Sequence, residues 1–355
     1  MGTPLVTALI DTYNHGRFIE TAIESVLNQD FPRAQMDVLV IDDGSTDDTS
    51  ERIKKFGDSI RYIRKANGGQ ASAFNMGLDQ AKGEIILLLD GDDWWLPKKT
   101  QRIVDEFEKN PRAGMAYHRL LLTHQEEGVV HESNPAPISG FVPRSRETLL
   151  LFHGVPTSCL AFRRSTLAPL LPVPTGLTIL ADGYLVYLAV FVTEVIFLSE
   201  CLAHFRFHDG NLFNFSEADP GRLLRKLECQ TVLVQEIEKW LQGKGYDLQE
   251  PNIASYVKRE RLTAEAIRWA LTGGARRDYF DHLRQEARLY RHMWTLRYRT
   301  FKLFSAILAR VLGHDAFTRV RARYSNWPTL GRLRQIFCPI YANESKSVDV
   351  GREAT

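Results

Sequence analysis

Short apolar segments alternate with helix-like segments over residues 5–123, and this alternation constrains the fold more than any other feature of the chain. Strands are predicted at Leu5–Ile10, Val38–Ile41, Ile60–Ile63, Glu84–Leu89 and Ala113–Leu122. Apolar residues recur between them with helical spacing, over residues 18–27, 49–56, 70–80 and 98–109. The pattern predicts an α/β fold in which helices cover both faces of a mostly parallel sheet. Ligands of such sheets bind outside the carboxyl ends of the strands.

The 355 residues divide into three parts that differ in proline content and in helical periodicity. Seven prolines interrupt residues 124–215 and exclude long helices there. Helical periodicity returns from about Asp219, over residues 222–240, 253–271 and 278–312. We therefore expect a first domain over residues 1–215, a helical region over residues 216–340 and a polar, disordered tail over residues 341–355.

The net charge of +2 is spread unevenly along the chain. Residues 284–334 contain twelve Lys and Arg against two Asp and Glu, so this stretch carries +10 and the remainder −8. Within it, residues 290–311 interleave basic with aromatic and aliphatic side chains, the composition of a basic amphipathic helix at a membrane surface. A solvated basic face on a helix packed against the first domain explains the pattern equally well. Nucleic acid is not expected as a partner, because no recognised binding motif accompanies the charge.

Cysteine usage and apolar segments bear on the location of the protein. The four cysteines are widely spaced and form no CxxC pair, which fits a reducing compartment. The N-terminus lacks the basic and long apolar regions of a signal peptide, and no apolar run approaches the roughly 18 residues of a membrane span. We expect a cytoplasmic protein, and the basic region leaves open peripheral contact at the inner face of the membrane.

The most informative single segment is Asp90-Gly91-Asp92-Asp93, at the end of the apolar strand Glu84–Leu89. Carboxylates clustered there repel one another, and their hard oxygen ligands suit Mg²⁺ or Mn²⁺ holding a diphosphate. Such a metal would neutralise the charge that grows on a leaving nucleoside diphosphate. An acidic loop that caps the following helix is an equally good interpretation of this segment alone.

Two further segments indicate ligand binding, but each does so only weakly when it is taken alone. Asp42 and Asp43 follow the second strand, where an acidic side chain could accept a hydrogen bond from a nucleobase N–H. A turn capped by Ser45 and Thr46 explains this segment more simply. Glycines in residues 67–77 would let the backbone approach a ligand at a helix N-terminus, although a plain loop-to-helix transition also explains them.

Together, in this order and spacing, the segments resemble the family 2 glycosyltransferases, which have the GT-A fold. The matching segments are Asp11-Thr12-Tyr13-Asn14, Asp42-Asp43-Gly44-Ser45-Thr46-Asp47, Asn67-Gly68-Gly69-Gln70 to Asn75, and Asp90-Gly91-Asp92-Asp93. The resemblance covers about residues 4–215. It implies an inverting, metal-dependent transfer of a sugar from a nucleotide-diphosphate donor, with a UDP-sugar expected, to a glycan or lipid-linked acceptor hydroxyl. Mn²⁺ or Mg²⁺ is the implied cofactor.

The resemblance also assigns residues to the donor site. By it, Asp90, Asp92 and His208 hold the metal. The implied nucleotide-sugar-binding residues are Thr12, Tyr13, Asn14, Asp42, Asp43, Asn67, Gly69, Gln70, Asn75, Asp90, Gly91 and Arg206. Among these residues, the segment at Thr12 and Tyr13 binds the nucleobase, together with either Asp42 or Asp43. Two positions depart from the family pattern: Asp11 replaces a usual proline, and Phe74 occupies a position where many members have arginine.

An inverting displacement needs a base that takes the proton from the acceptor hydroxyl. The segment that matches the family's Glu-Asp pair has Ala181 and Asp182, so the resemblance implies that Asp182 is the base. Alternatively, Asp182 caps the helix that follows it. His204–Asn211 looks like the segment that closes many family 2 catalytic domains. In it, Arg206 is a candidate phosphate partner and His208 a metal ligand or diphosphate contact. The acceptor-side candidates are Trp94, Trp95, Thr157 and Ser158.

Two other functions stay open. The missing glutamate at Ala181 is compatible with a non-catalytic nucleotide-sugar or glycan-binding protein on the same scaffold. A nucleotidyltransferase shares the sheet type, but it would need a basic, glycine-rich loop after the first strand, and residues 11–14 do not form one.

Overall fold

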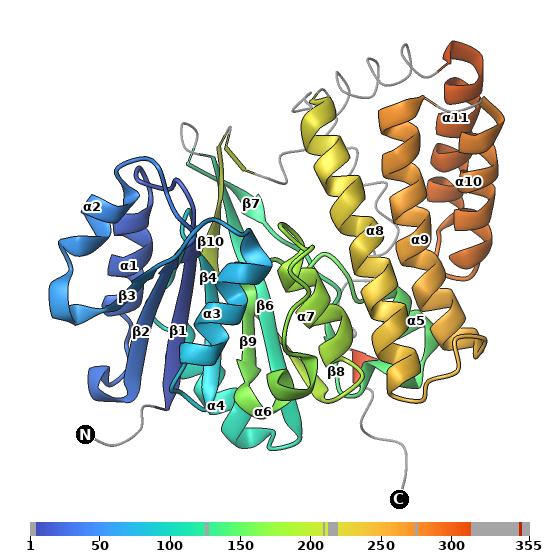
Figure 1. Ribbon diagram of the computed structural model, residues 1–355. Helices are drawn as coiled ribbons and strands as arrows, with labels where there is room; N and C mark the ends of the chain where they lie inside the picture. The colour runs from blue at the N-terminus through green and yellow to red at the C-terminus, as the bar shows by residue number, and fades with distance from the viewer. Residues whose placement is uncertain are drawn as a thin grey trace, which may run out of the picture. The chain divides into compact units, whose positions relative to one another are not determined.

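The structure is a computed structural model of the chain, and it describes residues 5–124, 128–208, 210–211, 219–273, 276–313 and 348–349. Two compact units make up the chain (Figure 1). The first contains Met1–Arg144, Phe152–Asn211 and Ser347–Thr355, and the second contains Ser145–Leu151 and Leu212–Lys346. The short segment Ser145–Leu151 therefore belongs with helices that come much later in the sequence.

The first unit is built on a nine-stranded sheet with the order β3-β2-β1-β4-β9-β6-β10-β5, and β7 pairs with β6. The strands are β1 (Val6–Thr12), β2 (Met36–Asp42), β3 (Arg61–Arg64), β4 (Ile85–Asp90), β5 (Trp94–Trp95), β6 (Ala113–His124), β7 (Gly128–Glu132), β9 (Leu160–Arg163) and β10 (Glu194–Phe207). The α/β fold and all five predicted strands are confirmed. The sheet is mixed rather than mostly parallel, because β9 inserts antiparallel between β4 and β6, and β5 and β7 also pair antiparallel.

The central strands are buried on both faces. In β1 and β4, the stretches Ala8–Ile10 and Ile86–Leu89 are at most 1% exposed, as expected for strands covered by helices on both sides. The helices of this unit are α1 (Ile19–Leu27), α2 (Thr49–Lys54), α3 (Gln70–Gln80), α4 (Lys99–Lys109), α6 (Arg164–Leu167) and α7 (Ala181–Ala189). α3 and α7 lie in front of the sheet in Figure 1. Gly77 lets α3 approach β1 closely, because a Cβ there would lie 2.4 Å from the Leu9 side chain.

The second unit is helical, as the sequence periodicity predicts. The helices described in it are α5 (Arg146–Leu151), α8 (Pro220–Gly243), α9 (Pro251–Thr272), α10 (Arg276–Leu289) and α11 (Leu296–Leu312). Asp219 caps α8 by accepting hydrogen bonds from two backbone N–H groups of its first turn. Two apolar clusters join these helices, one made of Trp269, Tyr279, Leu283, Ala306 and Ala309, the other of Leu150, Leu262, Leu289, Tyr290 and Trp294.

Three expectations for the C-terminal part need correction or qualification. The largely helical stretch over residues 278–312 is interrupted, because the Thr295 hydroxyl accepts a hydrogen bond from the Tyr298 N–H and starts α11 as a separate helix. Tyr290 and Trp294 are only 7% and 5% exposed, so they pack inside the unit and are not on a membrane-facing surface. Of the expected tail over residues 341–355, Val348–Asp349 forms β11, which pairs with β8 (Ile138–Ser139), and the rest lies outside the described residues.

Candidate functional site

The carboxyl ends of β1, β2 and β4 meet at one edge of the sheet. The strand register pairs Asp11 with Asp90 and Thr12 with Asp42. The N–H of Gly91 donates a hydrogen bond of 2.9 Å to the Asp11 carbonyl, which continues this pairing past the end of β4. The segments that the resemblance assigns to the donor site therefore lie side by side, at the edge where ligands of such sheets bind.

Asp90, Asp92 and Asp93 form an acidic loop at this edge, with one ligand oxygen from each within 4.8 Å of the others. Burial raises the pKa of Asp90 well above its usual value, and the charges of Asp11 and Asp92 act in the same direction. Burial and the charge of Asp92 likewise raise the pKa of Asp93. The Oδ1 atom of Asp11 is buried and has no hydrogen-bond partner among the described residues. Crowded, buried carboxylates fit a divalent cation, whose charge would offset their mutual repulsion.

Asp92 differs from its neighbours because two histidines face it. Burial alone would raise its pKa, but the charge of His15 and a hydrogen bond from His208 lower the pKa of Asp92 below the usual value. Its Oδ2 atom lies 2.9 Å from His208 Nε2 and 3.7 Å from His15 Nε2. The amide of Asn211 lies 3.4 Å from the same oxygen. Asp92 is therefore the carboxylate of the acidic loop that ionises most readily.

Arg206, near the end of β10, binds the acidic loop from a second direction. Its backbone N–H donates to Asp93 Oδ1 and its Nε donates to the Asp92 carbonyl, each over 2.8 Å. The guanidinium carbon lies 4.7 Å from the ring centre of Phe18 and 4.4 Å from that of Trp94. These contacts hold the positively charged guanidinium of Arg206 beside the carboxylates, where it could bind a phosphate.

Asp42 and Asp43, the expected base-binding carboxylates, already bind groups of the protein. Asp42 is fully buried and accepts a hydrogen bond of 2.8 Å from the Tyr62 hydroxyl. Asp43 accepts a hydrogen bond of 2.7 Å from the N–H of Gly69, and Lys65 Nζ lies 2.5 Å from its Oδ1. Asp43 therefore joins the second motif to the third, whereas Asp42 binds Tyr62 of β3, and a nucleobase would have to share both carboxylates with these partners.

Tyr13 is an exposed aromatic residue at the same edge, with 43% of its surface exposed. Its neighbour Asn14 adopts a left-handed backbone with a φ of 58°, and the Asn14 side chain accepts a hydrogen bond of 2.7 Å from the Thr46 N–H. Asn67, at the start of the third motif, is also exposed. The fixed loop leaves the Tyr13 ring available for stacking on a flat ligand.

Gln70 and Asn75 of the third motif bind other parts of the chain. Gln70 Oε1 accepts a hydrogen bond of 3.0 Å from the Ala181 N–H, and its Nε2 lies 3.4 Å from the Thr157 hydroxyl. Asn75 donates to and accepts from the backbone of Val173, with both bonds 2.8 Å long. Gln70 therefore supports the start of α7, whereas the Asn75 amide fixes the loop at Val173.

Asp182 lies in the first turn of α7, and Leu180 is the N-cap residue, so helix capping does not explain the aspartate. The Thr157 hydroxyl donates to Asp182 Oδ2 over 3.1 Å, and the Gly183 N–H donates to Oδ1 over 2.7 Å. Burial raises the pKa of Asp182. Burial and, next, the charge of Asp182 raise the pKa of Asp11, which places the two carboxylates in one electrostatic environment.

The four acceptor-side candidates separate into buried and accessible residues. Trp95, Thr157 and Ser158 are 2%, 1% and 0% exposed, so they support the site from beneath and are not accessible to a glycan. Trp94 is partly exposed and stacks on His204 at a ring distance of 4.2 Å. Trp94 is therefore the accessible aromatic of the four.

Asp93, Asn211, His15 and Lys99 also contribute to this site and are not among the predicted residues. Lys99 is fully buried, and its Nζ donates to the Ser158 carbonyl over 2.7 Å. The Ser158 hydroxyl in turn accepts a hydrogen bond of 3.1 Å from the Asp90 N–H, so Lys99 supports the acidic loop through Ser158. Burial lowers the pKa of Lys99 to about 7. His15 could have been predicted as a site residue, because it directly follows the first motif. Lys99 could not, because no sequence pattern predicts that a lysine is buried.

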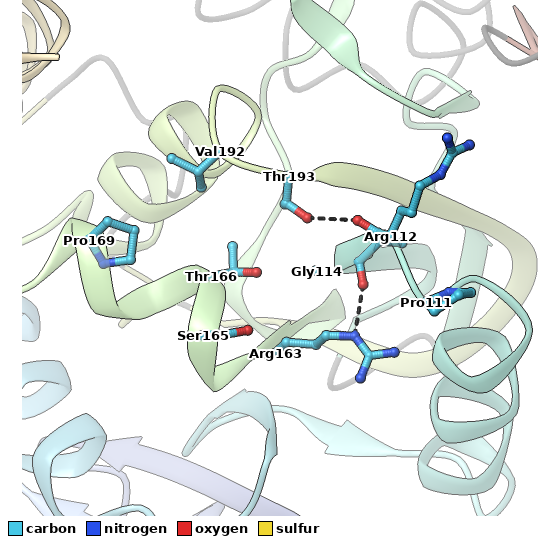
Figure 2. Close-up of a pocket in the computed structure, with 10 residues that line it drawn as sticks. Pro111, Arg112, Gly114, Arg163, Ser165, Thr166, Pro169, Val192 and Thr193 are labelled. Atoms are coloured by element: carbon cyan, nitrogen blue, oxygen red, sulfur yellow. Dashed lines mark hydrogen bonds between the residues drawn. The ribbon is translucent and has the colours of Figure 1, made fainter.

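A separate pocket lies at the opposite edge of the sheet, where β6 begins (Figure 2). Its lining includes Arg112, Arg163, Thr166, Val192 and Thr193. Arg163 donates to two backbone carbonyls, and the Thr193 hydroxyl donates to that of Arg112. None of the residues predicted for the donor or acceptor site lines this pocket, and its polar groups serve packing within the unit.

The chain is similar to known glycosyltransferases in sequence and in fold. The family model described as glycosyl transferase family 2 matches residues 7–170. An uncharacterized glycosyltransferase of Nostoc sp. is 33% identical over 216 residues, which are 58% of this chain and 66% of that protein. S. aureus TarS 1–349 in complex with UDP matches with a TM-score of 0.57 and 17% identity, over 91% of this chain and 92% of that one. The mannosyltransferase PcManGT from Pyrobaculum calidifontis, in complex with GDP-Man and Mn²⁺, matches with a TM-score of 0.53 and 18% identity, over 95% and 88% of the two chains. These two structural matches show a shared fold.

Proposed function

Because residues 7–170 belong to glycosyl transferase family 2, we propose that the protein is an inverting, metal-dependent glycosyltransferase. It transfers a sugar from a nucleotide-diphosphate donor, expected to be a UDP-sugar, to a hydroxyl of a glycan or lipid-linked acceptor. The observation that carries the proposal is the position of Asp182, which α7 brings into the electrostatic environment of Asp11 and Asp90 at the ends of β1 and β4.

Asp182 is the proposed base. Its raised pKa, caused by burial, makes the ionised carboxylate a better proton acceptor, and the hydrogen bonds from Thr157 and Gly183 hold its two oxygens. Asp182 takes the proton of the acceptor hydroxyl while that oxygen attacks the anomeric carbon. The bond between this carbon and the diphosphate oxygen breaks on the opposite face, so the configuration inverts and the nucleoside diphosphate leaves.

Asp90 and Asp92 would hold the divalent cation through hard carboxylate oxygens. When bound, the cation would neutralise negative charge on the departing diphosphate. Arg206 adds a fixed positive charge beside the same loop, which suits a phosphate oxygen. Lys99 and Ser158 keep the loop in position from beneath.

Support for the donor class comes from the structural relatives and from the residues at the same edge of the sheet. The structural relatives hold UDP in one case and GDP-Man with Mn²⁺ in the other, which supports a nucleotide-diphosphate sugar here. Thr12 and the exposed Tyr13 ring would contact the base, with Asp42 and Asp43 forming the wall behind it.

Thermal unfolding of the purified protein with UDP, GDP or dTDP, each with and without Mn²⁺, tests the proposal. We expect UDP and Mn²⁺ together to raise the melting temperature more than either does alone, since ligand at a hundred times its Kd stabilises a protein by about 2.7 kcal/mol. Chelation with EDTA should cancel the joint effect. A nucleotide effect that does not depend on metal would contradict the proposed metal-dependent donor site.

We also propose that α11 contacts an anionic membrane at its inner face, as a lipid-linked acceptor would require. Leu303, Phe304 and Val311 are 54%, 63% and 66% exposed, and Arg299 and Arg310 of the same helix are exposed as well. Exposed apolar side chains next to basic ones are typical of helices that lie in a lipid interface. None of the helices in the described ranges combines the length and apolar character that a membrane span requires.

Flotation with lipid vesicles tests this contact. The protein is expected to float with vesicles that contain phosphatidylglycerol and less with pure phosphatidylcholine, and the double variant Leu303→Glu/Phe304→Glu should stay in solution. Leu224→Glu is the matched control, because Leu224 is 47% exposed on α8 of the same unit. Flotation that is equal for the double variant and the control would exclude α11 as the contact.

A further inference from the structure

Gln70, the first residue of α3, connects the loop of the third motif to the start of α7. Just before it, the N–H of Gly69 donates to the Asp43 carboxylate over 2.7 Å. The backbone N–H of Gln70 itself donates to the Thr178 carbonyl over 3.0 Å. α3 and α7 lie side by side in front of the sheet (Figure 1). The Gln70 side chain therefore reaches from α3 to the backbone of Ala181, in the first turn of α7.

The backbone of Ala181 fixes the orientation of the Gln70 amide. The Ala181 N–H can only donate, and it lies 3.0 Å from Gln70 Oε1, so this atom is the oxygen of the amide. The NH₂ group of the amide then faces Thr157, with Nε2 at 3.4 Å from the hydroxyl. Because the amide nitrogen can only donate, Thr157 Oγ1 is the acceptor in this contact.

The hydroxyl of Thr157 has a single proton, and the contact with Gln70 leaves that proton for another partner. Asp182 Oδ2, at 3.1 Å from Thr157 Oγ1, receives it. Thr157 is buried, so bulk water does not reach this hydrogen bond. The orientation of one amide thus makes Thr157 a donor to the proposed base.

The first turn of α7 lacks a capping side chain of its own. Leu180, the N-cap residue, makes no side-chain cap and has a left-handed backbone with a φ of 69°. This conformation is strained for a residue with a bulky side chain, and it persists only where the surroundings hold it. Gln70 Oε1 accepts the Ala181 N–H from outside the helix, which is the task of a capping oxygen. Gln70 therefore also holds the turn in which Asp182 lies.

We infer that Gln70 is a positioning residue for Asp182, because it caps the first turn of α7 and holds the Thr157 hydroxyl as a donor to the carboxylate. The inference rests on the proposed function of Asp182 as the base and deepens it. It gives Gln70 a task toward the base, whereas the sequence resemblance implies a donor contact. With Thr157 on Oδ2 and the Gly183 N–H on Oδ1, the carboxylate has a fixed orientation before the acceptor binds.

Gln70→Glu tests the inference most sharply, because it keeps the size of the side chain and replaces only the NH₂ group by an oxygen. The new carboxylate can still accept from the Ala181 N–H, but it also accepts the Thr157 proton and so turns the hydroxyl away from Asp182. The hydrogen bond from Thr157 lowers the pKa of Asp182, so its loss and the added negative charge both raise that pKa. Carbon-13 NMR of the full chain should show Asp182 titrating at higher pH in this variant than in the unaltered protein.

Two further variants separate the hydroxyl from the added charge. Gln80→Glu is the matched control, because it places the same charge on α3 about 15 Å further along the helix, and it should leave the titration of Asp182 unchanged. In a Thr157→Val background, Gln70→Glu has no hydroxyl to turn, so its effect on the Asp182 pKa should be about half or less. An unchanged titration in Gln70→Glu, or an equal effect with and without the hydroxyl, would overturn the inference. Asp182→Asn identifies the carbon signal.

Initial rates of UDP release are the second measurement. We expect Gln70→Glu to lower kcat about tenfold at neutral pH, to move the acid limb of the kcat profile to higher pH, and to leave the donor KM within about twofold. Gln70→Met, which removes the amide without adding charge, should lower kcat and leave the acid limb in place. A raised donor KM with unchanged kcat would make Gln70 a donor contact and refute the inference. Absence of transfer by the unaltered protein would refute the proposed function, and the titration of Asp182 would still decide whether Gln70 orients it.

Discussion

Asp182→Asn is expected to lower the rate of sugar transfer by about 10²–10⁴-fold, which is the range that a positioned general base contributes. The amide cannot take the proton of the acceptor hydroxyl, but it matches the carboxylate in size. The Thr157 hydroxyl, which donates to Asp182 Oδ2 over 3.1 Å, can turn to accept from the amide. We therefore expect the fold and the affinity for UDP with Mn²⁺ to be unchanged.

Initial rates of UDP release at saturating donor, with calorimetry of UDP binding, measure this effect. Thr157→Val is the companion variant, because it removes the hydroxyl that orients the base while it keeps the volume, and it should lower kcat about tenfold. Since burial raises the pKa of Asp182 and the base must be ionised, kcat should fall as pH drops through a value above that of an exposed aspartate. A rate for Asp182→Asn within about threefold of the unaltered protein would exclude the base role.

The part of the fold that sequence alone predicts is the part made of continuous apolar strands. β1, β2 and β4 are buried on both faces, so each contains a continuous aliphatic stretch, over residues 8–10, 38–41 and 85–89. β9 and β10 carry no such signal, since β9 has four residues next to a proline-rich stretch and β10 includes Glu200, His204 and Arg206. The antiparallel insertion of β9, which makes the sheet mixed, depends on pairing with strands distant in sequence.

The position of each site motif was predictable, but the partner of each side chain was not. Acidic residues at the ends of parallel strands must meet at one edge, and Asp90 and Asp11 do so. The partners come from elsewhere in the chain: Asn75 binds Val173, and Asp182 is oriented by Thr157. Sequence spacing does not encode such contacts, so it could not predict that residues implied as ligand-binding also bind other parts of the protein.

Asp90→Asn and Asp92→Asn are the second pair of decisive variants. Each is expected to lower transfer by about 10²-fold or more, because each would remove an oxygen ligand that we propose for the cation beside the leaving diphosphate. In the metal-free protein, the two substitutions should change the stability of the fold in opposite directions. Burial and the charge of Asp11 raise the pKa of Asp90, so its ionised form destabilises the fold and an amide relieves that cost. Asp92 is instead stabilised as an anion by His15 and His208, so its amide loses a favourable interaction.

In EDTA at neutral pH, we expect the melting temperature to rise by about 2–4 °C in Asp90→Asn and to fall by a similar amount in Asp92→Asn. Differential scanning fluorimetry of both variants and the unaltered protein measures these shifts. Equal melting temperatures of the two variants would contradict the electrostatic difference between the two carboxylates. Excess Mn²⁺ should stabilise the unaltered protein more than either variant, and equal stabilisation of all three would exclude both carboxylates as ligands.

For each variant, the change in stability relative to the unaltered protein should depend on pH in a defined direction. A carboxyl group whose pKa is raised by folding contributes stability below its unfolded pKa, and that contribution is lost as pH rises through the folded value. The advantage of Asp90→Asn over the unaltered protein should therefore be largest at neutral and higher pH and vanish in acid. For Asp92, whose pKa is lowered, the contribution is present above the unfolded pKa and is lost as pH falls through the folded value, so the deficit of Asp92→Asn should also disappear in acid. The two curves then converge on the unaltered protein from opposite sides, a result that a uniform loss of packing at the acidic loop would not produce.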